Sequence, residues 1–197
     1  MCSVIGFQGD FNFDLLSKVF DNSRIRGIHS FGYSFYKNEK IVTKKFLDYS
    51  KFLQSIHFDS PNKFIAHFRY STSGDYKILN NNQPLSNEKI SIAFNGIISQ
   101  KTKTEMEKEF NVVIEAENDG FVLMNKINDL DFLSNRSITF AVVGLKSNRL
   151  FAMKNSKRPL WISNENQSIL IASTNDILKR SGIQKAEELK NLKMYQF

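Results

Sequence analysis

The sequence predicts an α+β fold in which antiparallel or mixed sheets are covered by helices. Apolar patterns typical of strands and of helices both recur along the 197 residues. Strands alternate with helices in the first half, whereas four strands follow one another over residues 138–173, joined by short turns. A series of this kind favours antiparallel pairing over a doubly wound parallel sheet.

The first half of the chain contains two helical patterns and four strand patterns. Apolar residues at helical spacing predict helices over about residues 12–22 and 48–58. Short apolar runs, rich in aromatic and β-branched residues, predict the strands. These strands cover residues 3–7, 30–36, 40–46 and 63–70.

A polar stretch over residues 71–88 separates the two halves, and we expect it to be a loop. It holds Gly74, three successive asparagines and Pro84. Loops of this length in a compact domain are often functional.

The second half returns to regular structure. We expect a short helix behind a capping box of Thr104 and Glu107, and a helix that starts at Asp119. The remaining expected elements are strands over 89–94, 138–146, 149–155, 159–163 and 168–173, a short helix over 174–182 and a final edge strand over 189–197.

Composition limits the possible class of protein. Hydrophobic residues make up 41% of the chain, so residues 1–197 can form one domain with its own core. With one cysteine, neither a disulfide framework nor a cysteine-based metal site is expected, and we expect no cofactor. The net charge is +7, but the basic residues are scattered, so nucleic acid is not expected as the main partner. No apolar run is long enough to cross a bilayer and no signal peptide is recognisable, so we expect a cytoplasmic protein.

The single cysteine, Cys2, directly follows the initiator methionine. If Met1 is removed, the α-amine of Cys2 can act as the base for its own thiol, and no separate histidine is needed. Taken alone, a lone cysteine is more often a small buried apolar residue. Position therefore leaves both interpretations open.

Three further segments carry polar residues at points where chemistry is possible. Arg69 ends a strand and could grip a carboxylate with its guanidinium, although strand-end charges are commonly only solvated. Asn95-Gly96 is by itself the strongest short signal for a hairpin turn, and it could also supply oxyanion donors. Asp119 at a helix start could interact favourably with the helix dipole, or its carboxylate could bind a substrate ammonium.

Together these segments resemble the class II glutamine amidotransferases, whose glutaminase domain is an N-terminal-nucleophile hydrolase. The similarity rests on eight motifs that occur in the family's order over nearly the whole chain. They are MCSVIGF, RGIHSFG (Arg26, Gly27, Ser30, Gly32), AHFRYSTSG, NNNQP, FNGII, NDGFVL, KRPLWI and IASTNDIL.

The resemblance implies a four-layer α-β-β-α sandwich of two mostly antiparallel sheets. It also implies roles for six residues: Cys2 as nucleophile, Asn95 and Gly96 as oxyanion donors, Arg69 and Thr72 at the glutamine carboxylate, and Asp119 at its ammonium. Supporting positions in the matched motifs are Arg26, His67 and Tyr70.

Three residues depart from the family's motifs. Ser3 replaces the glycine that usually follows the nucleophile, and its side chain could crowd the site or point away. Phe94 stands where histidine often precedes Asn-Gly, and Phe121 stands where a glutamate follows the aspartate.

The resemblance implies glutamine as substrate and ammonia as product. Family members usually carry a synthase domain after the glutaminase domain, and this chain has no such domain, so we expect a separate ammonia-accepting synthetase as partner. Two alternatives stay open: another amidohydrolase of the same fold, and a non-catalytic binding or regulatory protein.

Overall fold

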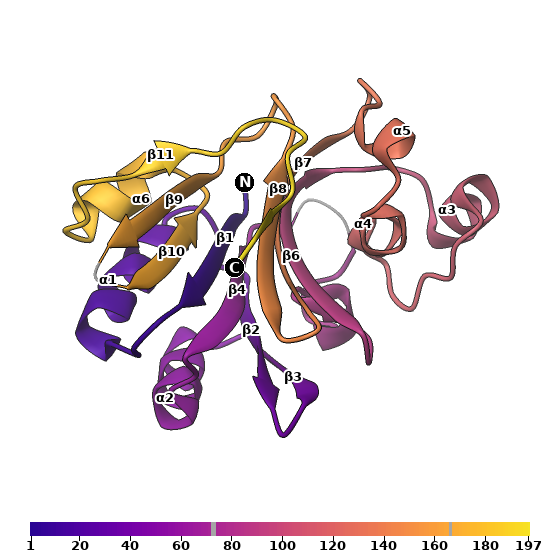
Figure 1. Ribbon diagram of the computed structural model, residues 1–197. Helices are drawn as coiled ribbons and strands as arrows, with labels where there is room; N and C mark the ends of the chain where they lie inside the picture. Colours follow the sequence, from indigo (N-terminus) through magenta and orange to yellow (C-terminus); the bar gives the residue numbers. More distant parts are fainter. Residues whose placement is uncertain (72–73, 166) are drawn as a thin grey trace.

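Two antiparallel sheets form the centre of the molecule (Figure 1), for which the computed structural model describes residues 1–71, 74–165 and 167–197. Sheet A has the strand order β11-β9-β10-β1-β4-β2-β3 and sheet B the order β12-β8-β7-β6-β5. Sheet A contains β1 (Ser3–Gln8), β2 (Ser30–Lys37), β3 (Lys40–Phe46), β4 (Lys63–Arg69), β9 (Trp161–Glu165), β10 (Ser168–Ala172) and β11 (Glu187–Glu188). Sheet B contains β5 (Leu85–Ser86), β6 (Ile90–Ile97), β7 (Thr139–Lys146), β8 (Arg149–Lys154) and β12 (Tyr195–Gln196).

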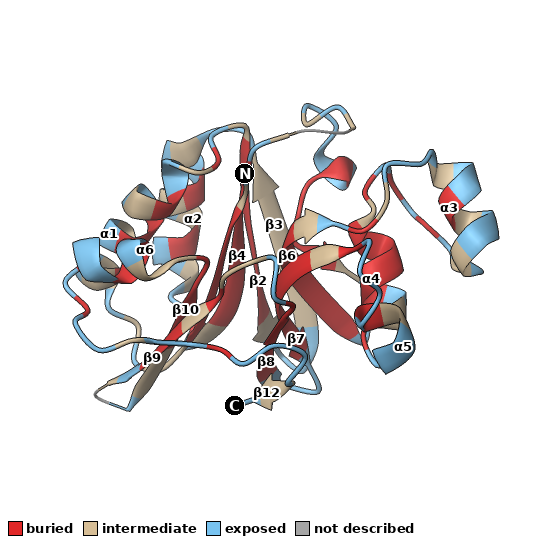
Figure 2. Cartoon of the chain, turned by 90° about the horizontal axis from the view of Figure 1, so that it is seen from above, coloured by how far each residue is buried: buried red, intermediate tan, exposed pale blue. Residues whose placement is uncertain are grey.

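Helices cover the outer face of each sheet, so the molecule has four layers, as expected from the sequence (Figure 1). Sheet A is covered by α1 (Phe13–Arg24), α2 (Tyr49–Asp59) and α6 (Asn175–Arg180). Sheet B is covered by α3 (Lys103–Phe110), α4 (Gly120–Lys126) and α5 (Leu130–Leu133). Figure 2 shows the buried residues concentrated in the strands and on the inward sides of the helices.

The inner faces of the two sheets share one apolar cluster. Sheet A contributes Val4 and Ile65, and sheet B contributes Ala93, Ala141 and Val143, all fully buried. Because side chains alternate along a strand, neighbours of these residues face the helices instead. This alternation decides which motif residues lie between the sheets.

The segment over residues 71–88 is more structured than expected. A 3₁₀ turn, η1 (Leu79–Asn81), and the short strand β5 both lie within it. The sequences of these two elements show no apolar periodicity. Hydrogen bonds to residues that are distant in the sequence hold both elements in place.

The capping box of α3 lies one pair earlier than predicted. Thr102 caps the helix, and Glu105 accepts a hydrogen bond from the Thr102 N–H at 2.8 Å. Both Thr102/Glu105 and Thr104/Glu107 have the required spacing, so the prediction of the second pair was wrong. The observed start directs Met106 into the core of sheet B.

The four sequential strands of the second half belong to two sheets. The β7–β8 hairpin lies in sheet B, whereas the β9–β10 hairpin lies in sheet A. The chain therefore changes sheet between Lys154 and Trp161.

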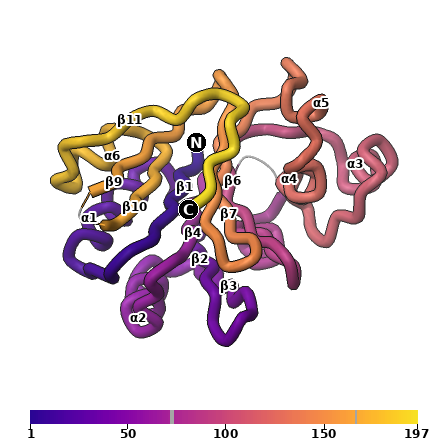
Figure 3. Tube along the Cα trace, in the orientation of Figure 1, coloured from indigo at the N-terminus to yellow at the C-terminus, as the bar shows by residue number. Residues whose placement is uncertain are grey.

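The C-terminal segment crosses back from sheet A to sheet B (Figure 3). It runs from β11 to β12, and Lys154 binds it through an ion pair with Glu188 at 2.7 Å. The chain termini appear near one another in Figure 1, but Figure 2 shows them at opposite ends of the molecule. Within the described parts of the chain, no helix combines the length and apolar character needed to cross a membrane.

Candidate active site

Three polar residues form a row across the inner face of sheet A. Ser30 of β2 pairs with Arg69 of β4, and Ser3 of β1 pairs with Phe68. Cys2 precedes Ser3, so its position continues this register beside Arg69. The order across the sheet is therefore Cys2, Arg69 and Ser30.

The Cys2 thiol is partly buried and weakly bonded. Its Sγ lies 3.7 Å from the main-chain oxygen of Tyr70. Burial raises the pKa of the thiol, and the positive charges of Arg69 and Arg26 only partly oppose this effect. A thiol with a raised pKa is protonated at neutral pH, so it needs a base to become a nucleophile.

Arg26 fixes the main chain at the same place. Its Nε donates to the Cys2 carbonyl oxygen at 3.2 Å. Its terminal nitrogen, and that of Arg158, lie 3.8 and 3.7 Å from the Met1 sulfur. Because Met1 is present, the Cys2 nitrogen is here an amide.

Asn95 and Gly96 lie inside strand β6 and not in a hairpin turn. They pair with Ala141 and Phe140 of β7, so the turn predicted from the dipeptide alone is wrong. A side chain at Gly96 would place its Cβ 1.9 Å from the Thr139 oxygen, so only glycine allows this strand approach.

The Asn95 side chain faces sheet A. Ala93, two residues earlier on the same strand, belongs to the cluster between the sheets. Asn95 is 3% exposed. Among the described residues its Nδ2 finds no hydrogen-bond acceptor, which is uncommon for a buried amide.

Arg69 is buried, and its guanidinium is bound to the segment over residues 74–82. It donates to the main-chain oxygen of Asn81 at 2.9 Å, to the Asn82 side-chain oxygen and to the Gly74 oxygen at 3.3 Å. Thr72, expected beside it, lies outside the described residues.

Asp119 is at the N-terminal end of α4, but its side chain does not cap this helix. Its Oδ2 accepts hydrogen bonds from the N–H groups of Ile98 at 2.6 Å and Ser99 at 3.1 Å, just beyond β6. Burial raises the pKa of the carboxyl, and these bonds oppose the rise. Asp119 lines a cavity of about 260 Å³ together with Gly74.

The supporting residues occupy different positions. His67 lies two residues before Arg69 on the inner face of β4. It pairs with Val4 of β1 and with Gly32 of β2, and it is fully buried. Burial, aided by the charge of Arg69, lowers the pKa of His67 to about 3, so the ring is neutral at physiological pH. Tyr70 is 46% exposed and lies beside the thiol through its main chain.

The three departures from the motifs all point away from this face. Ser3 lies on the helix-facing side of β1 with Ile5 and is fully buried. Phe94 and Phe121 both pack in the core between sheet B and its helices. Of the two possibilities for Ser3, the structure shows the second: its side chain points away from the face that holds Cys2.

Several residues near the site carried no role in the sequence prediction. Asn81 accepts from the Glu117 N–H at 3.0 Å and receives a bond from Asn118, which precedes Asp119. Asn82 and Gln83 are also buried, and Gln83 accepts from the Phe94 N–H at 2.6 Å. The NNNQP motif marked this stretch in the sequence, but no role was assigned to its residues.

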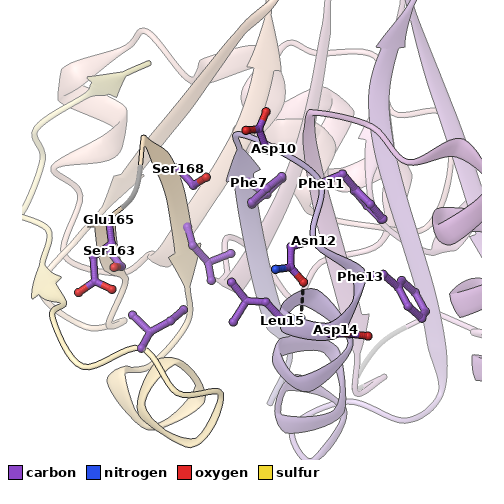
Figure 4. A pocket seen from close by; sticks show the side chains of 12 residues that line it. Phe7, Asp10, Phe11, Asn12, Phe13, Asp14, Leu15, Ser163, Glu165 and Ser168 are labelled. Atoms are coloured by element: carbon purple, nitrogen blue, oxygen red, sulfur yellow. Dashed lines mark hydrogen bonds between the residues drawn. The ribbon is translucent and has the colours of Figure 1, made fainter.

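A larger cavity, of about 650 Å³, lies at the opposite end of β1 (Figure 4). Aromatic rings and three carboxylates line it, and none of the predicted site residues does. The aromatic rings are those of Phe7, Phe11 and Phe13, and the carboxylates are those of Asp10, Asp14 and Glu165.

The fold is shared with solved amidotransferase structures. Glutamine phosphoribosylpyrophosphate amidotransferase from B. subtilis matches with a TM-score of 0.77 at 19% identity, over 99% of this chain and 47% of that chain. A structure described as the allosteric regulatory enzyme of purine biosynthesis gives the same score and identity, over 99% of this chain and 46% of that chain. This chain therefore spans less than half the length of both.

A match of more similar length is a glutamine aminotransferase class-II domain protein from Silicibacter pomeroyi. Its TM-score is 0.65 at 11% identity, over 99% of this chain and 94% of that chain. These matches show that the chain shares its fold with these solved structures, and they confirm the expected α+β arrangement of two mostly antiparallel sheets. No protein-family model and no curated protein sequence matches the chain.

Proposed function

We propose that this chain is a glutaminase that hydrolyses the side-chain amide of glutamine through a thioester at Cys2. The observation that carries the proposal is the buried Nδ2 of Asn95, which has no acceptor among the described residues and lies on the side of β6 that faces sheet A, the sheet whose inner face holds Cys2 and Arg69. A donor kept without a partner costs stability, and an oxyanion formed in front of it would use that donor.

The proposed reaction begins with removal of Met1. The free α-amine of Cys2 takes the thiol proton as Sγ attacks the amide carbon, which gives a tetrahedral oxyanion. Asn95 Nδ2 and the Gly96 N–H stabilise that charge. The amine then passes the proton to the departing nitrogen, the C–N bond breaks, and ammonia leaves a γ-glutamyl thioester. Water hydrolyses the thioester, which returns the thiol and releases glutamate.

Two charged residues would bind the amino-acid end of glutamine. Arg69 would hold the α-carboxylate, with Thr72 beside it, and Asp119 would hold the α-ammonium. Both side chains are already oriented, Arg69 by Asn81 and Gly74 and Asp119 by Ile98. Preorganised charges of opposite sign favour a substrate with an amino-acid head over a simple amide.

We further propose that the ammonia passes to a separate synthetase docked over this site. Large apolar side chains stand exposed around Cys2, which is typical of an interaction surface. Ile25 is 72% exposed, Ile28 58% and Tyr70 46%, and all three remain when Met1 is removed. Ile25 and Ile28 flank Arg26, which binds the Cys2 carbonyl.

The test combines the mass of the N-terminus with glutamine hydrolysis. The purified protein should lack Met1, release glutamate from glutamine and gain one adduct at Cys2 with 6-diazo-5-oxo-L-norleucine. Cys2→Ala should abolish glutamate release and labelling, whereas Ser3→Gly, next to it on the opposite face, should retain both.

Other outcomes would favour the alternatives. Retention of Met1 in the native protein, with no labelling alone or with candidate synthetases, would identify a non-catalytic protein. Equal turnover of amides that lack the α-amino group would identify a different amidohydrolase.

A further inference from the structure

His29 lies between two tyrosine rings beside the candidate site. Its ring centroid is 4.8 Å from that of Tyr70 and 4.8 Å from that of Tyr76, with interplanar angles of 25° and 19°. Tyr70 directly follows Arg69, whereas Tyr76 belongs to the segment over residues 74–82. The stack therefore joins the end of β4 to this segment.

Hydrogen bonds fix the orientation of the His29 ring. The Ser71 N–H donates to His29 Nδ1 at 2.9 Å, so Nδ1 is the unprotonated nitrogen and the ring proton is on Nε2. The His29 N–H donates to the Arg69 oxygen at 3.0 Å. His29 is thus bonded to the chain on both sides of Tyr70.

The segment held by this stack supplies the contacts that orient Arg69. The oxygens of Gly74 and Asn81 both accept from the guanidinium. Asn82 accepts from it as well, and its Nδ2 donates to the Tyr76 oxygen at 2.7 Å. Movement of Tyr76 would therefore displace groups that set the direction of Arg69.

We propose that His29 is a positioning residue that clamps the 74–82 segment and thereby holds Arg69 in the direction needed to bind a substrate carboxylate. The clamp follows from the contacts of His29 given above. Its effect on glutamine binding rests on the proposed function. His29 touches no reacting group, so its effect passes through Arg69.

Tryptic cleavage after Lys77 tests the clamp without reference to activity. Lys77 is exposed within the segment, and cleavage of a native chain reports how often that segment opens. His29→Ala removes two ring stacks and one acceptor, so cleavage after Lys77, followed by mass spectrometry, should accelerate roughly tenfold or more. His29→Phe keeps the stacks and loses the acceptor, so its rate should be intermediate.

His57 provides a matched control. It also contacts an aromatic ring, that of Phe13, with the ring centroids 4.2 Å apart and the planes tilted by 51°, but it lies on α2 away from this segment. His57→Ala should leave cleavage after Lys77 unchanged. Tyr76→Leu, a change within the segment, should accelerate it and serves where His29→Ala does not fold. Equal cleavage in wild type, His29→Ala and Tyr76→Leu would overturn the clamp.

Steady-state kinetics test the effect on the substrate. In His29→Ala the KM for glutamine should rise about tenfold while kcat changes by less than a factor of three. A fall in kcat at constant KM would overturn the positioning of Arg69. A wild type without glutaminase activity would count against the proposed function alone, because the cleavage comparison decides the clamp independently.

Discussion

At the scale of single residues, the buried side-chain amide of Asn95 is the main support for the proposed site. A buried donor without an acceptor costs about 1–3 kcal/mol, and natural proteins retain few such groups. Asn95 Nδ2 is one of several such atoms among the described residues, and Ala93 on the same side of β6 is packed between the sheets. An oxyanion bound at the proposed site would supply the acceptor that this amide lacks.

Asn95→Ala should separate activity from stability. Loss of one oxyanion donor typically lowers kcat by about 10²–10³-fold. Because Nδ2 has no acceptor among the described residues, the free energy of unfolding in urea should change little.

A second asparagine gives the opposite control. Asn12 caps α1 by accepting from the Leu15 N–H at 3.0 Å (Figure 4), and it follows the C-terminal end of β1, whereas Cys2 precedes the start of this strand. Asn12→Ala should cost about 1 kcal/mol of stability and leave kcat unchanged. The interpretation of Asn95 fails if its replacement lowers stability like Asn12→Ala but spares kcat.

At the scale of elements, the sequence predicted most helices and strands because their apolar spacing is local. Helix α1 and the hairpin of β2 and β3 follow directly from such spacing. The same reasoning failed at Asn95-Gly96, where a dipeptide typical of turns lies within β6. Its neighbour β7 pairs with it throughout, and a local pattern contains no information about that partner.

The conformation of the 74–82 segment could not be predicted from local sequence patterns for the same reason. Its conformation depends on Arg69, on Glu117 and on His29, all distant in the sequence or separated by polar loop residues. The motifs indicated candidate site residues, but only the register of β1 and β4 shows that Ser3 faces away from Cys2.

The start of α3 offers a test of the corrected capping box. Thr102→Ala removes the cap hydroxyl, so amide exchange in α3 should accelerate about fivefold, which corresponds to about 1 kcal/mol. Thr104→Ala, the pair predicted from the sequence, should change exchange much less, because Thr102 is the residue bonded to Glu105. Equal acceleration in the two variants would contradict the assignment.

At the scale of the whole molecule, the two sheets are joined by a core in which one titratable ring is enclosed. The β8–β9 connection and the C-terminal segment each link sheet A to sheet B, so the sheets cannot separate without breaking several contacts. His67 lies fully buried on the inner face of sheet A, where burial disfavours the protonated ring and the main chain of Phe94 only partly offsets that effect. Protonation of His67 would therefore place a positive charge between the two sheets.

His67 should make the folded state sensitive to acid. Its pKa is about 3 in the folded protein, against about 6.5 when unfolded, so below pH 6.5 the unfolded chain binds a proton that the folded chain does not. The contribution of His67 to stability is thus complete above pH 6.5 and declines as the pH falls toward 3. Between pH 7 and pH 5 it should fall by about 2 kcal/mol, since each pKa unit corresponds to about 1.36 kcal/mol.

Urea unfolding at pH 7 and pH 5 measures this fall as a difference within each protein. His67→Met keeps an apolar side chain of similar size between the sheets and removes the titrating ring, so its stability should fall by about 2 kcal/mol less than that of wild type. His57→Met, on the exposed side of α2, should behave like wild type. The same fall in wild type and His67→Met would mean that His67 is protonated in the folded protein, and the space between the sheets would then have to admit water or an acceptor for its ring.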